Sequence, residues 1–281
     1  MADIVFDIGG TNMRVALRNA DGSIGEVLSA PTPQEREKGL EQLVSLCRSC
    51  AKEESIARIA GGIAGVVSVP SSILHRSPNL PGWEGLNFTK ELGERIGATV
   101  LVRNDAMLGG LGEARRGAGR GYSIVAYLAV GTGVGGARIV DGVLDEFSFG
   151  FEPGHQIICH KEGKTLENLV GGRGVEARFG TKPGLLADKE AWKDISKIFA
   201  QGVYNTILHW SPHVVVLAGS MITDKNGILI DLVQEEVSRL LRVFPSSPVI
   251  ARAELGGLSV LVGASEYVSL SKTNSRLGVD N

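Results

Sequence analysis

The sequence predicts an α/β protein in two halves that repeat one structural device, and three observations support this. Each half opens with a short apolar strand, a bend containing glycine and threonine, and a second strand that ends in turn residues. Each half continues with segments of helical apolar spacing that alternate with short buried strands. Glycine supplies 38 of the 281 residues, roughly twice the usual share, so the backbone must often turn tightly or approach another group closely.

The first half is expected to form a small α/β lobe over residues 1–105. Residues 3–8 are an apolar run ending at Gly9, residues 13–17 alternate, and a turn follows at 19–22, which together predict a β-hairpin with a glycine-rich bend. The later elements are predicted as a strand at 23–30, an amphipathic helix at 35–54, a strand at 58–68, a helix at 87–96 and a buried strand at 99–103.

The second half is expected to form a larger α/β lobe over residues 106–257. It repeats the opening device with a strand at 123–130, a glycine-rich bend at 131–136 and a strand at 137–140. The later elements are predicted as helices at 166–179, 189–210 and 227–243, with a buried strand at 213–217. A further helix starts near residue 258, and we expect the C-terminal segment 258–281 to rejoin the first lobe.

Composition excludes several classes of protein. Lys and Arg number 29 against 31 Asp and Glu, a net charge of −2, so neither nucleic acid nor a membrane surface is an expected partner. The longest uncharged stretch, residues 121–137, is short and broken by glycine, and it predicts no membrane helix. The N-terminal residues lack the basic region of a secretory signal. With only three cysteines, we expect a cytoplasmic protein in a reducing compartment.

Two glycine bends are candidate anion sites. Residues 131–136 match G-x-G-x-x-G, but that pattern marks a dinucleotide site only when a helix follows, and a strand is predicted here. The sequence contains no G-x-x-x-x-G-K-[ST] phosphate loop. Backbone N–H groups in such bends can bind anionic oxygens; two ordinary tight hairpins are the alternative. The bend residues concerned are Gly9, Gly10, Thr11, Gly131, Thr132 and Gly133.

Two residues at strand ends extend this hypothesis. Asp7 lies beside the first bend and can hold Mg²⁺ through water, because Mg²⁺ keeps most of its hydration shell. Gly219 follows the strand at 213–217, where the sugar or base of a nucleotide can lie against a residue without a side chain. A plain strand-to-helix turn is the alternative for Gly219.

Asp105 is the candidate general base. It ends an apolar strand, which places its carboxylate at the sheet edge where ligands of α/β proteins bind. A carboxylate there suits proton removal from a hydroxyl nucleophile. The alternative is an N-cap for a helix over residues 106–113, and both roles are compatible.

A polar cluster suits a ligand with many hydroxyl groups, because carboxylates, imidazole and amides form paired hydrogen bonds with them. Its members are Asn79, Asn104, Glu152, His155 and Glu167. A metal site at His155, Cys159 and His160 is the competing interpretation, with three donors at most. Cys47 and Cys50 form a C-x-x-C inside a predicted helix, a context that favours core packing over redox chemistry.

At these residues the sequence resembles the ROK family of sugar kinases and related repressors, within the actin-like ATPase superfamily. Residues 7–14 (DIGGTNMR) and 131–136 (GTGVGG) look like the family's two phosphate motifs. Residues 78–83 (PNLPGW) look like its sugar-contacting loop, and Asn104-Asp105 like its catalytic pair. Glu152-x-Gly-His155 and Leu166-Glu167 match positions where the family binds sugar hydroxyls. The resemblance covers nearly the whole chain.

The resemblance implies a two-lobed, ribonuclease H-like fold of duplicated mixed-sheet domains with an interdomain cleft. It implies that Asp105 removes a proton from a sugar hydroxyl that attacks the γ-phosphate of ATP, with closure of the lobes excluding water. Other hydroxyls would be held by Asn79, Asn104, Glu152, His155 and Glu167. The phosphates would be lined by Gly10, Thr11, Asn12, Thr132 and Gly133, and the nucleoside by Gly219. ATP, Mg²⁺ and a homodimer are the implied cofactors and assembly.

One segment departs from the family pattern. Most members place a zinc motif, C-x-C-G-x-x-G-C, between the positions that match His155 and Glu167. Here residues 156–166 are too few and contain a single cysteine, so we expect no structural zinc. The segment that positions His155 must then be held in another way.

The leading hypothesis is an ATP-dependent hexokinase that converts glucose to glucose 6-phosphate. Kinases of fructose, N-acetylglucosamine or N-acetylmannosamine are alternatives within the same resemblance. The family's repressors carry a helix-turn-helix before the first phosphate motif, for which a motif that begins at Asp7 leaves no room. A sugar-binding module without catalysis is a third possibility, against which the retained Asp105 argues.

Overall fold

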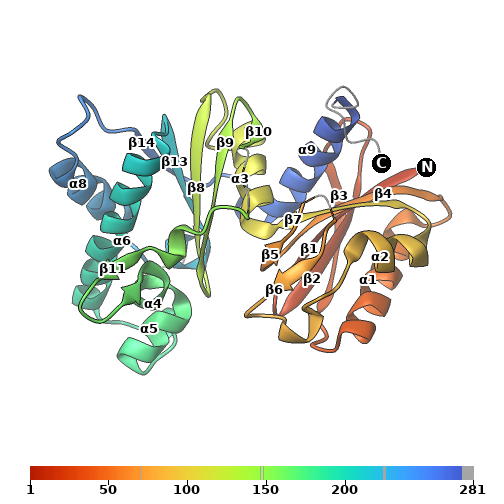
Figure 1. Ribbon diagram of the computed structural model, residues 1–281, viewed down its shortest axis with the longest axis horizontal. Helices are drawn as coiled ribbons and strands as arrows, with labels where there is room; N and C mark the ends of the chain where they lie inside the picture. Colours follow the sequence, from red (N-terminus) through yellow and green to blue (C-terminus); the bar gives the residue numbers. More distant parts are fainter. Residues whose placement is uncertain (70, 146, 148, 224–225, 274–281) are drawn as a thin grey trace. The chain divides into compact units, whose positions relative to one another are not determined.

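The computed structural model describes residues 1–69, 71–145, 147, 149–223 and 226–273, and the chain forms two compact units (Figure 1). Unit 1 contains Met1–Arg115 and Gly257–Asn281, and unit 2 contains Arg116–Gly256. The units are therefore nearly equal in length, not small and large as predicted. Residues 274–281 of the predicted C-terminal segment lie outside the described residues.

The boundary predicted after Asp105 is corrected to Arg115. The reason is close helix packing: a Cβ added to Gly112 would overlap the carbonyl oxygen of Ser259 and lie 3.0 Å from the amide of Gly263. The helix that begins at Asp105 therefore packs against the C-terminal helix and belongs to the same unit.

Unit 1 begins with three successive strands and continues with helices and further strands. In chain order they are β1 (Ala2–Ile8), β2 (Asn12–Arg18), β3 (Ile24–Pro31), α1 (Arg36–Ala51), β4 (Ile56–Ile63), β5 (Val66–Val67), β6 (Leu74–Arg76), η1 (Pro81–Trp83), α2 (Phe88–Ile96), β7 (Thr99–Asn104), α3 (Asp105–Arg116), η4 (Gly256–Leu258, continuous with the end of unit 2) and α9 (Ser259–Thr273). The predicted strand at 58–68 thus ends at Ile63, because the chain turns at Gly65, where φ is +146°.

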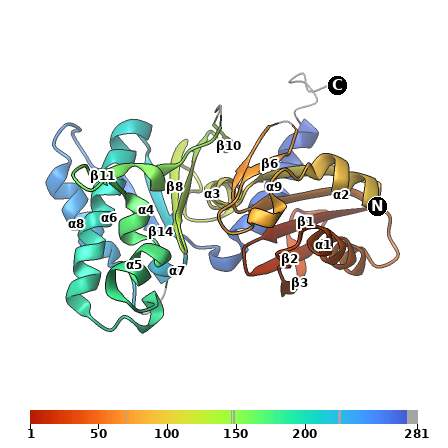
Figure 2. The ribbon, with the colours of Figure 1, turned by 60° about the horizontal axis from the view of Figure 1, so that its bottom comes forward.

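The sheet of unit 1 has the order β3-β2-β1-β4-β7, with an antiparallel hairpin beside three parallel strands. Ile8 pairs with Ile63, and Ile63 with Asn104, so β1, β4 and β7 end in one row. Helices α1 and α2 cover one face of the sheet and α9 the other (Figure 2). Whatever follows these three strands is therefore gathered at a single edge.

Unit 2 is built in the same way. Its elements are β8 (Ile124–Val130), β9 (Val134–Val140), β10 (Val143–Leu144), η2 (Pro153–His155), β11 (Ile157–Cys159), β12 (Lys164–Thr165), α4 (Leu166–Val170), α5 (Gly172–Phe179), η3 (Pro183–Leu185), α6 (Lys189–Trp210), β13 (Val214–Ala218), α7 (Ser220–Thr223), α8 (Ile230–Leu240) and β14 (Val249–Arg252). The predicted helix at 166–179 is split, because Gly171 is extended at ψ 155°. The predicted bend at 131–136 is shorter, since β9 already begins at Val134.

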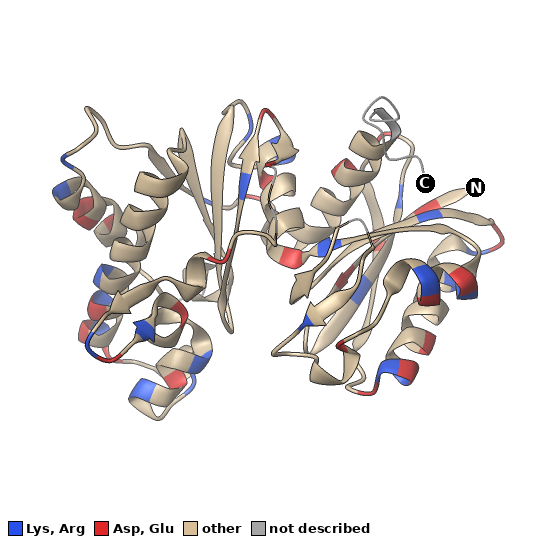
Figure 3. Ribbon diagram, in the orientation of Figure 1, with Lys and Arg blue, Asp and Glu red and all other residues tan. Residues whose placement is uncertain are grey.

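The sheet of unit 2 has the order β10-β9-β8-β13-β14, again a hairpin beside parallel strands. Its core lies between the sheet and the long helix α6, with α4 and α8 packed alongside. The predicted α/β class with duplicated mixed sheets is confirmed by this repeated topology. Charged residues of both signs are mixed along the outer helices of each unit (Figure 3).

The cysteines and helices bear on two further predictions. Cys47 is fully buried in the core of unit 1, and burial raises the pKa of its thiol to about 12, as the core-packing interpretation requires. All three cysteines are free thiols. Within the described ranges, no helix combines the length and the apolar character needed to cross a membrane.

Candidate functional site

The first bend exposes backbone N–H groups at the sheet edge of unit 1. Its carbonyl groups are occupied: the Thr32 hydroxyl donates to Gly9 O (2.8 Å), the Thr32 amide to Thr11 O (2.8 Å) and the Gln34 side chain to Gly10 O (2.9 Å). In the described part of the chain, the amides of Gly10 and Thr11 donate to no protein acceptor. The bend therefore presents donors without competing acceptors, which is the arrangement that binds an anion.

Asp7 lies on β1 directly opposite Arg14 on β2. The two side chains form an ion pair, in which Arg14 Nε donates to Asp7 Oδ2 at 3.1 Å. Burial raises the pKa of the Asp7 carboxyl, and the charge and hydrogen bond of Arg14 oppose this. Asn12 stands exposed at the start of β2. The described residues contain no group of three or more His, Cys, Asp or Glu that could hold a metal.

Asn104 ends β7 and caps the helix that follows. Its Oδ1 accepts the amide of Met107 (3.2 Å), and its Nδ2 donates to Gly65 O (3.0 Å). The cap predicted as the alternative role of Asp105 is thus supplied by its neighbour. A side chain with both ends bound to backbone fixes the start of α3 against the loop after β4.

Asp105 is the first residue of α3 and is half-buried. Its Oδ1 accepts the amide of Ala106 (2.9 Å). Gly62 on β4 lies against it, since a Cβ at Gly62 would be 3.0 Å from Asp105 Cα. The absence of a side chain at Gly62 therefore allows the carboxylate to stand at the edge where β1, β4 and β7 end.

Asn79 lies beside the first bend. A Cβ added to Gly10 would come within 2.8 Å of Asn79 Cβ. The loop that carries Asn79 is fixed by Ser77, whose hydroxyl donates to Ala64 O (2.6 Å) and accepts the amide of Leu80 (3.2 Å). Unit 1 therefore brings together Asn79, the amide bend and, along the same row of strand ends, Asp105. The segment 61–65, which is the end of β4 and the turn after it, was not predicted as part of the site. Its closely spaced glycines are the signal that could have found it.

The second bend follows β8 in unit 2. The amide of Gly131 donates to Gly133 O (2.9 Å), while Gly131 O and Thr132 O accept the amides of Gly172 (2.8 Å) and Arg173 (3.2 Å) at the start of α5. The amides of Thr132 and Gly133 donate to no protein acceptor among the described residues. This bend, like the first, keeps its carbonyls occupied and its donors available for an anion.

Glu167 holds the second bend. Its Oε2 accepts the amide of Val134 at 2.8 Å, and a Cβ at Gly133 would overlap this carboxylate. Glu167 was predicted to bind sugar hydroxyls, and sequence reasoning missed its contact with the bend. A carboxylate oxygen has more than one acceptor site, so this hydrogen bond leaves Glu167 able to accept others.

Glu152 immediately precedes the short helix η2, and His155 is the last residue of that helix. Their side chains are 49% and 66% exposed, with Glu152 Oε2 and His155 Nε2 3.9 Å apart. Partial burial raises the pKa of Glu152, the charge of His155 lowers it, and the charge of Glu167 raises it. Unit 2 therefore brings Glu152, His155 and Glu167 into one electrostatic group, while Asn79, Asn104 and Asp105 belong to unit 1.

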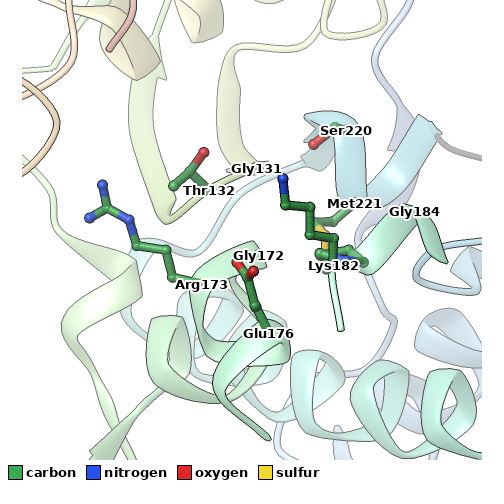
Figure 4. Close-up of a pocket in the computed structure, with 10 residues that line it drawn as sticks. Gly131, Thr132, Gly172, Arg173, Glu176, Lys182, Gly184, Ser220 and Met221 are labelled. Carbon is green, nitrogen blue, oxygen red and sulfur yellow. The ribbon is translucent and has the colours of Figure 1, made fainter. Parts of the chain in front are cut away.

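A pocket of about 270 Å³ adjoins the second bend (Figure 4). It is lined by Gly131, Thr132, Gly172, Arg173, Glu176, Lys182, Pro183, Gly184, Ser220 and Met221. Gly219 immediately precedes Ser220 of this lining in the chain. Its φ is +95°, and a Cβ added to it would overlap Val130 O. Sequence reasoning missed the two cations of this pocket, Arg173 and Lys182. The glycines at the start of α5 are the sequence signal that could have predicted this side of the pocket. No motif near Lys182 indicates that it lines the pocket.

Comparison with known proteins gives the family. The model of the ROK family matches residues 4–270, so the chain belongs to the ROK family, and the predicted resemblance is confirmed. Glucokinase of Streptomyces coelicolor is 24% identical over 94% of this chain and 96% of its own. Fructokinase of Lactococcus lactis subsp. cremoris is 25% identical over 86% of both chains. N-acetylgalactosamine kinase AgaK of Shewanella sp. is 25% identical over 92% of this chain and 94% of its own.

Solved structures show the same fold. The ROK hexokinase of Thermus thermophilus superimposes with a TM-score of 0.81 at 24% identity, over 97% of this chain and 100% of that one. A ROK family glucokinase of Streptomyces griseus, in complex with glucose and AMPPNP, gives a TM-score of 0.79 at 22% identity over 95% and 99%. A ROK family transcriptional regulator gives a TM-score of 0.79 at 16% identity over 94% and 76%.

Proposed function

We propose that this protein transfers the γ-phosphate of ATP to a hydroxyl of a hexose and that its substrate is glucose, which becomes glucose 6-phosphate. The observation that carries the proposal is the half-buried carboxylate of Asp105 at the sheet edge of unit 1, in line with a bend whose amides are available to an anion. Family membership supports phosphoryl transfer to a sugar, and the glucokinase relatives support glucose.

In the proposed reaction, Asp105 accepts the proton of the sugar hydroxyl as its oxygen attacks the γ-phosphorus. The bond from that phosphorus to the bridging oxygen breaks, and ADP leaves with the electron pair. Asn104 fixes the start of α3 and so holds Asp105 at the strand end. The remaining hydroxyls are held by Asn79, Asn104, Glu152, His155 and Glu167.

The nucleotide is assigned to the bends and to the pocket of unit 2. Four bend amides without protein acceptors, at Gly10, Thr11, Thr132 and Gly133, suit phosphate oxygens. Gly9, Gly131 and Asn12 shape the bends. The pocket beside Gly219 carries a cation at Arg173 and another at Lys182, which suits a polyanion.

Magnesium fits this donor set. Mg²⁺ keeps several waters and is held through one or two carboxylates plus substrate phosphates, and Asp7 is a carboxylate at the end of β1 with Oδ2 engaged by Arg14. When bound, Mg²⁺ would neutralise charge that develops on the phosphate oxygens.

A panel of sugars tests the proposal. ATP turnover is measured with glucose, fructose, mannose, N-acetylglucosamine, N-acetylmannosamine and N-acetylgalactosamine, with each sugar omitted as its control. We expect the highest kcat/KM with glucose. A higher value with fructose or an N-acetylated sugar replaces glucose by that substrate, for which the fructokinase and N-acetylgalactosamine kinase relatives are the support. No turnover with any sugar overturns the kinase proposal.

We also propose that the protein acts as a homodimer in the cytoplasm. Family resemblance supports the dimer, and three free thiols agree with a reducing compartment. Light scattering after gel filtration measures the assembly, and a monomer mass at micromolar concentration contradicts it.

A further inference from the structure

The segment between His155 and Glu167 joins two parts of the proposed sugar site. It consists of β11 and β12, a two-stranded hairpin with an irregular register and an exposed Ile157 (62%). An isolated two-stranded hairpin is marginally stable in water. Something outside the hairpin must therefore fix the residues at its two ends.

Gln156 makes that attachment at the base of the hairpin. Its side-chain Nε2 donates to Pro153 O (2.8 Å) and to Gly202 O on α6 (3.4 Å), and its Oε1 accepts from Asn205 Nδ2 (2.8 Å). Its backbone oxygen accepts the amide of Leu166 (2.9 Å), the first residue of α4. One residue thus ties η2 and the start of α4 to the long helix α6.

The opposite side of η2 is fixed by close packing on β9. A Cβ at Gly154 would overlap Val134 O, and a Cβ at Gly136 would lie 2.6 Å from Pro153 Cγ. The short helix therefore lies between β9 on one side and the Gln156 amide on the other. Because the β9 contact has no spare space, η2 cannot move toward β9, and the amide contact with α6 opposes movement away from β9.

We propose that Gln156 and Asn205 form an amide pair that positions Glu152 and His155 for the sugar. The proposal rests on the proposed function and adds two positioning residues to it. The pair acts through Pro153 O, which lies between Glu152 and His155 in the chain. Its effect on Glu167 is smaller, because the bond that fixes the start of α4 comes from the backbone of Gln156, which survives replacement of the side chain.

The two partners are not equivalent. Asn205 reaches η2 only through Gln156 Oε1, whereas Gln156 also contacts Pro153 and Gly202 directly. Replacing Gln156 by alanine therefore removes all three of these side-chain hydrogen bonds, and replacing Asn205 removes one of them. In the double variant, the hydrogen bond of Asn205 is already absent because Gln156 is alanine, so replacing Asn205 has no further effect on η2. Contacting residues in one network show this kind of non-additivity.

The test compares Gln156→Ala, Asn205→Ala and the double variant with Gln201→Ala, an exposed amide on α6. Amide hydrogen exchange is measured on each, followed by KM and kcat for sugar and for ATP. We expect faster exchange over residues 152–166 in Gln156→Ala and unchanged exchange over 214–218. We expect sugar KM to rise about tenfold, as for loss of a neutral hydrogen bond that orients a binding group, with ATP KM within about twofold.

The outcomes separate this inference from the proposed function. Unchanged exchange over 152–166 in Gln156→Ala overturns the amide pair, whether or not the wild type phosphorylates a sugar. Unchanged sugar KM in an active enzyme overturns its positioning role, as does an equal rise for sugar and ATP. A double variant clearly worse than Gln156→Ala also contradicts the model. If Gln156→Ala exchanges faster over 152–166 as expected but the wild type turns over no sugar, the proposed function alone is overturned.

Discussion

The two units present the same bend but hold it differently. In unit 1 neutral groups hold the bend: Thr32 and Gln34 occupy its carbonyl oxygens. In unit 2 the amides at the start of α5 occupy the carbonyl oxygens, and the carboxylate of Glu167 accepts the amide of Val134. Of the contacts named here, only those at the bend of unit 2 include a charged group, the carboxylate of Glu167.

This difference bears on two roles that we propose for unit 2. Glu167 contacts the bend proposed for phosphate and belongs to the group proposed for sugar hydroxyls. In unit 1 the corresponding neighbour of the bend is Asn79, which touches Gly10 through its Cβ. Each unit thus links a bend proposed for phosphate to a side chain proposed for sugar. The link is the hydrogen bond of Glu167 in unit 2 and the packing of Asn79 against Gly10 in unit 1.

The largest expected effect comes from Asp105→Asn. The amide cannot accept a proton, so we expect kcat to fall by about 10²–10⁴-fold, while the sugar dissociation constant stays within about threefold. Steady-state turnover and calorimetric sugar titration measure the two quantities. Asp21→Asn, on an exposed turn of the same unit, is the control. Near wild-type kcat in Asp105→Asn would show that Asp105 is not the base.

Next come Gly10→Ala and Gly133→Ala, which test how each bend is held. The new Cβ at Gly133 meets the end of a flexible carboxylate, whereas at Gly10 it meets the Cβ and the backbone oxygen of Asn79. A flexible end can move aside and backbone cannot. We expect kcat/KM to fall about tenfold in Gly133→Ala and about 100-fold in Gly10→Ala.

The control for this pair is Gly93→Ala in α2, where the added Cβ finds ordinary contact distances. Calorimetric melting of all three variants accompanies the kinetics. A larger loss in Gly133→Ala than in Gly10→Ala would reverse the comparison between the bends.

Local patterns predicted much of this architecture because their causes are local. Strand alternation and a Gly-Thr bend are readable within ten residues, so both hairpins were located correctly. The role of Asn104 was not separable from that of Asp105, since adjacent residues at a helix start can exchange the cap. The site roles themselves stay predictions until they are measured.

Long-range contacts account for what the sequence did not show. Gln156 and Asn205 meet although they are 49 positions apart, and neither lies in a recognisable motif. Lys182 lines the pocket from the loop between α5 and η3, far along the chain from Gly131 and Thr132. The split at Gly171 was missed because apolar residues occur on both sides of it, at Val170 and Val175.

A pH effect of intermediate size is expected at Glu152. Partial burial raises the pKa of its carboxyl, so it takes up a proton at a higher pH than an ordinary glutamate and then loses acceptor charge. Sugar affinity should fall as the pH drops toward that raised pKa, and Glu152→Gln should abolish this part of the profile. Titration calorimetry between about pH 5 and about pH 8 measures the pH dependence of sugar affinity. The exposed Glu235→Gln variant is the control.

The raised pKa of Glu152 also determines how the free energy of unfolding changes with pH. Because the folded state binds this proton more tightly than the unfolded chain, the free energy of unfolding contributed by Glu152 is present at low pH and is lost as pH rises through the raised pKa. Urea unfolding of wild type and Glu152→Gln at both ends of the range measures the difference. If the wild type becomes more stable relative to Glu152→Gln as the pH rises, the raised pKa of Glu152 is contradicted.

The smallest effects belong to helix caps, one in each unit. Asn87 Oδ1 accepts the amide of Lys90 at 3.0 Å, and Asp188 Oδ1 accepts that of Glu190 at 2.9 Å. Either alanine variant should lower the free energy of unfolding by about 1 kcal/mol and leave both KM values unchanged. Asp188→Asn keeps an acceptor and loses only the charge near the helix N-terminus, so it should lose about 0.5 kcal/mol.

Urea unfolding and steady-state kinetics of these variants decide how the other losses are interpreted. If a cap in either unit can be removed without changing KM, then a changed KM in Gly10→Ala or Gly133→Ala reflects the geometry of its bend. If both cap variants raise KM as much as the glycine variants do, the difference between the two bends is one of stability, because any loosening of a unit would then weaken binding.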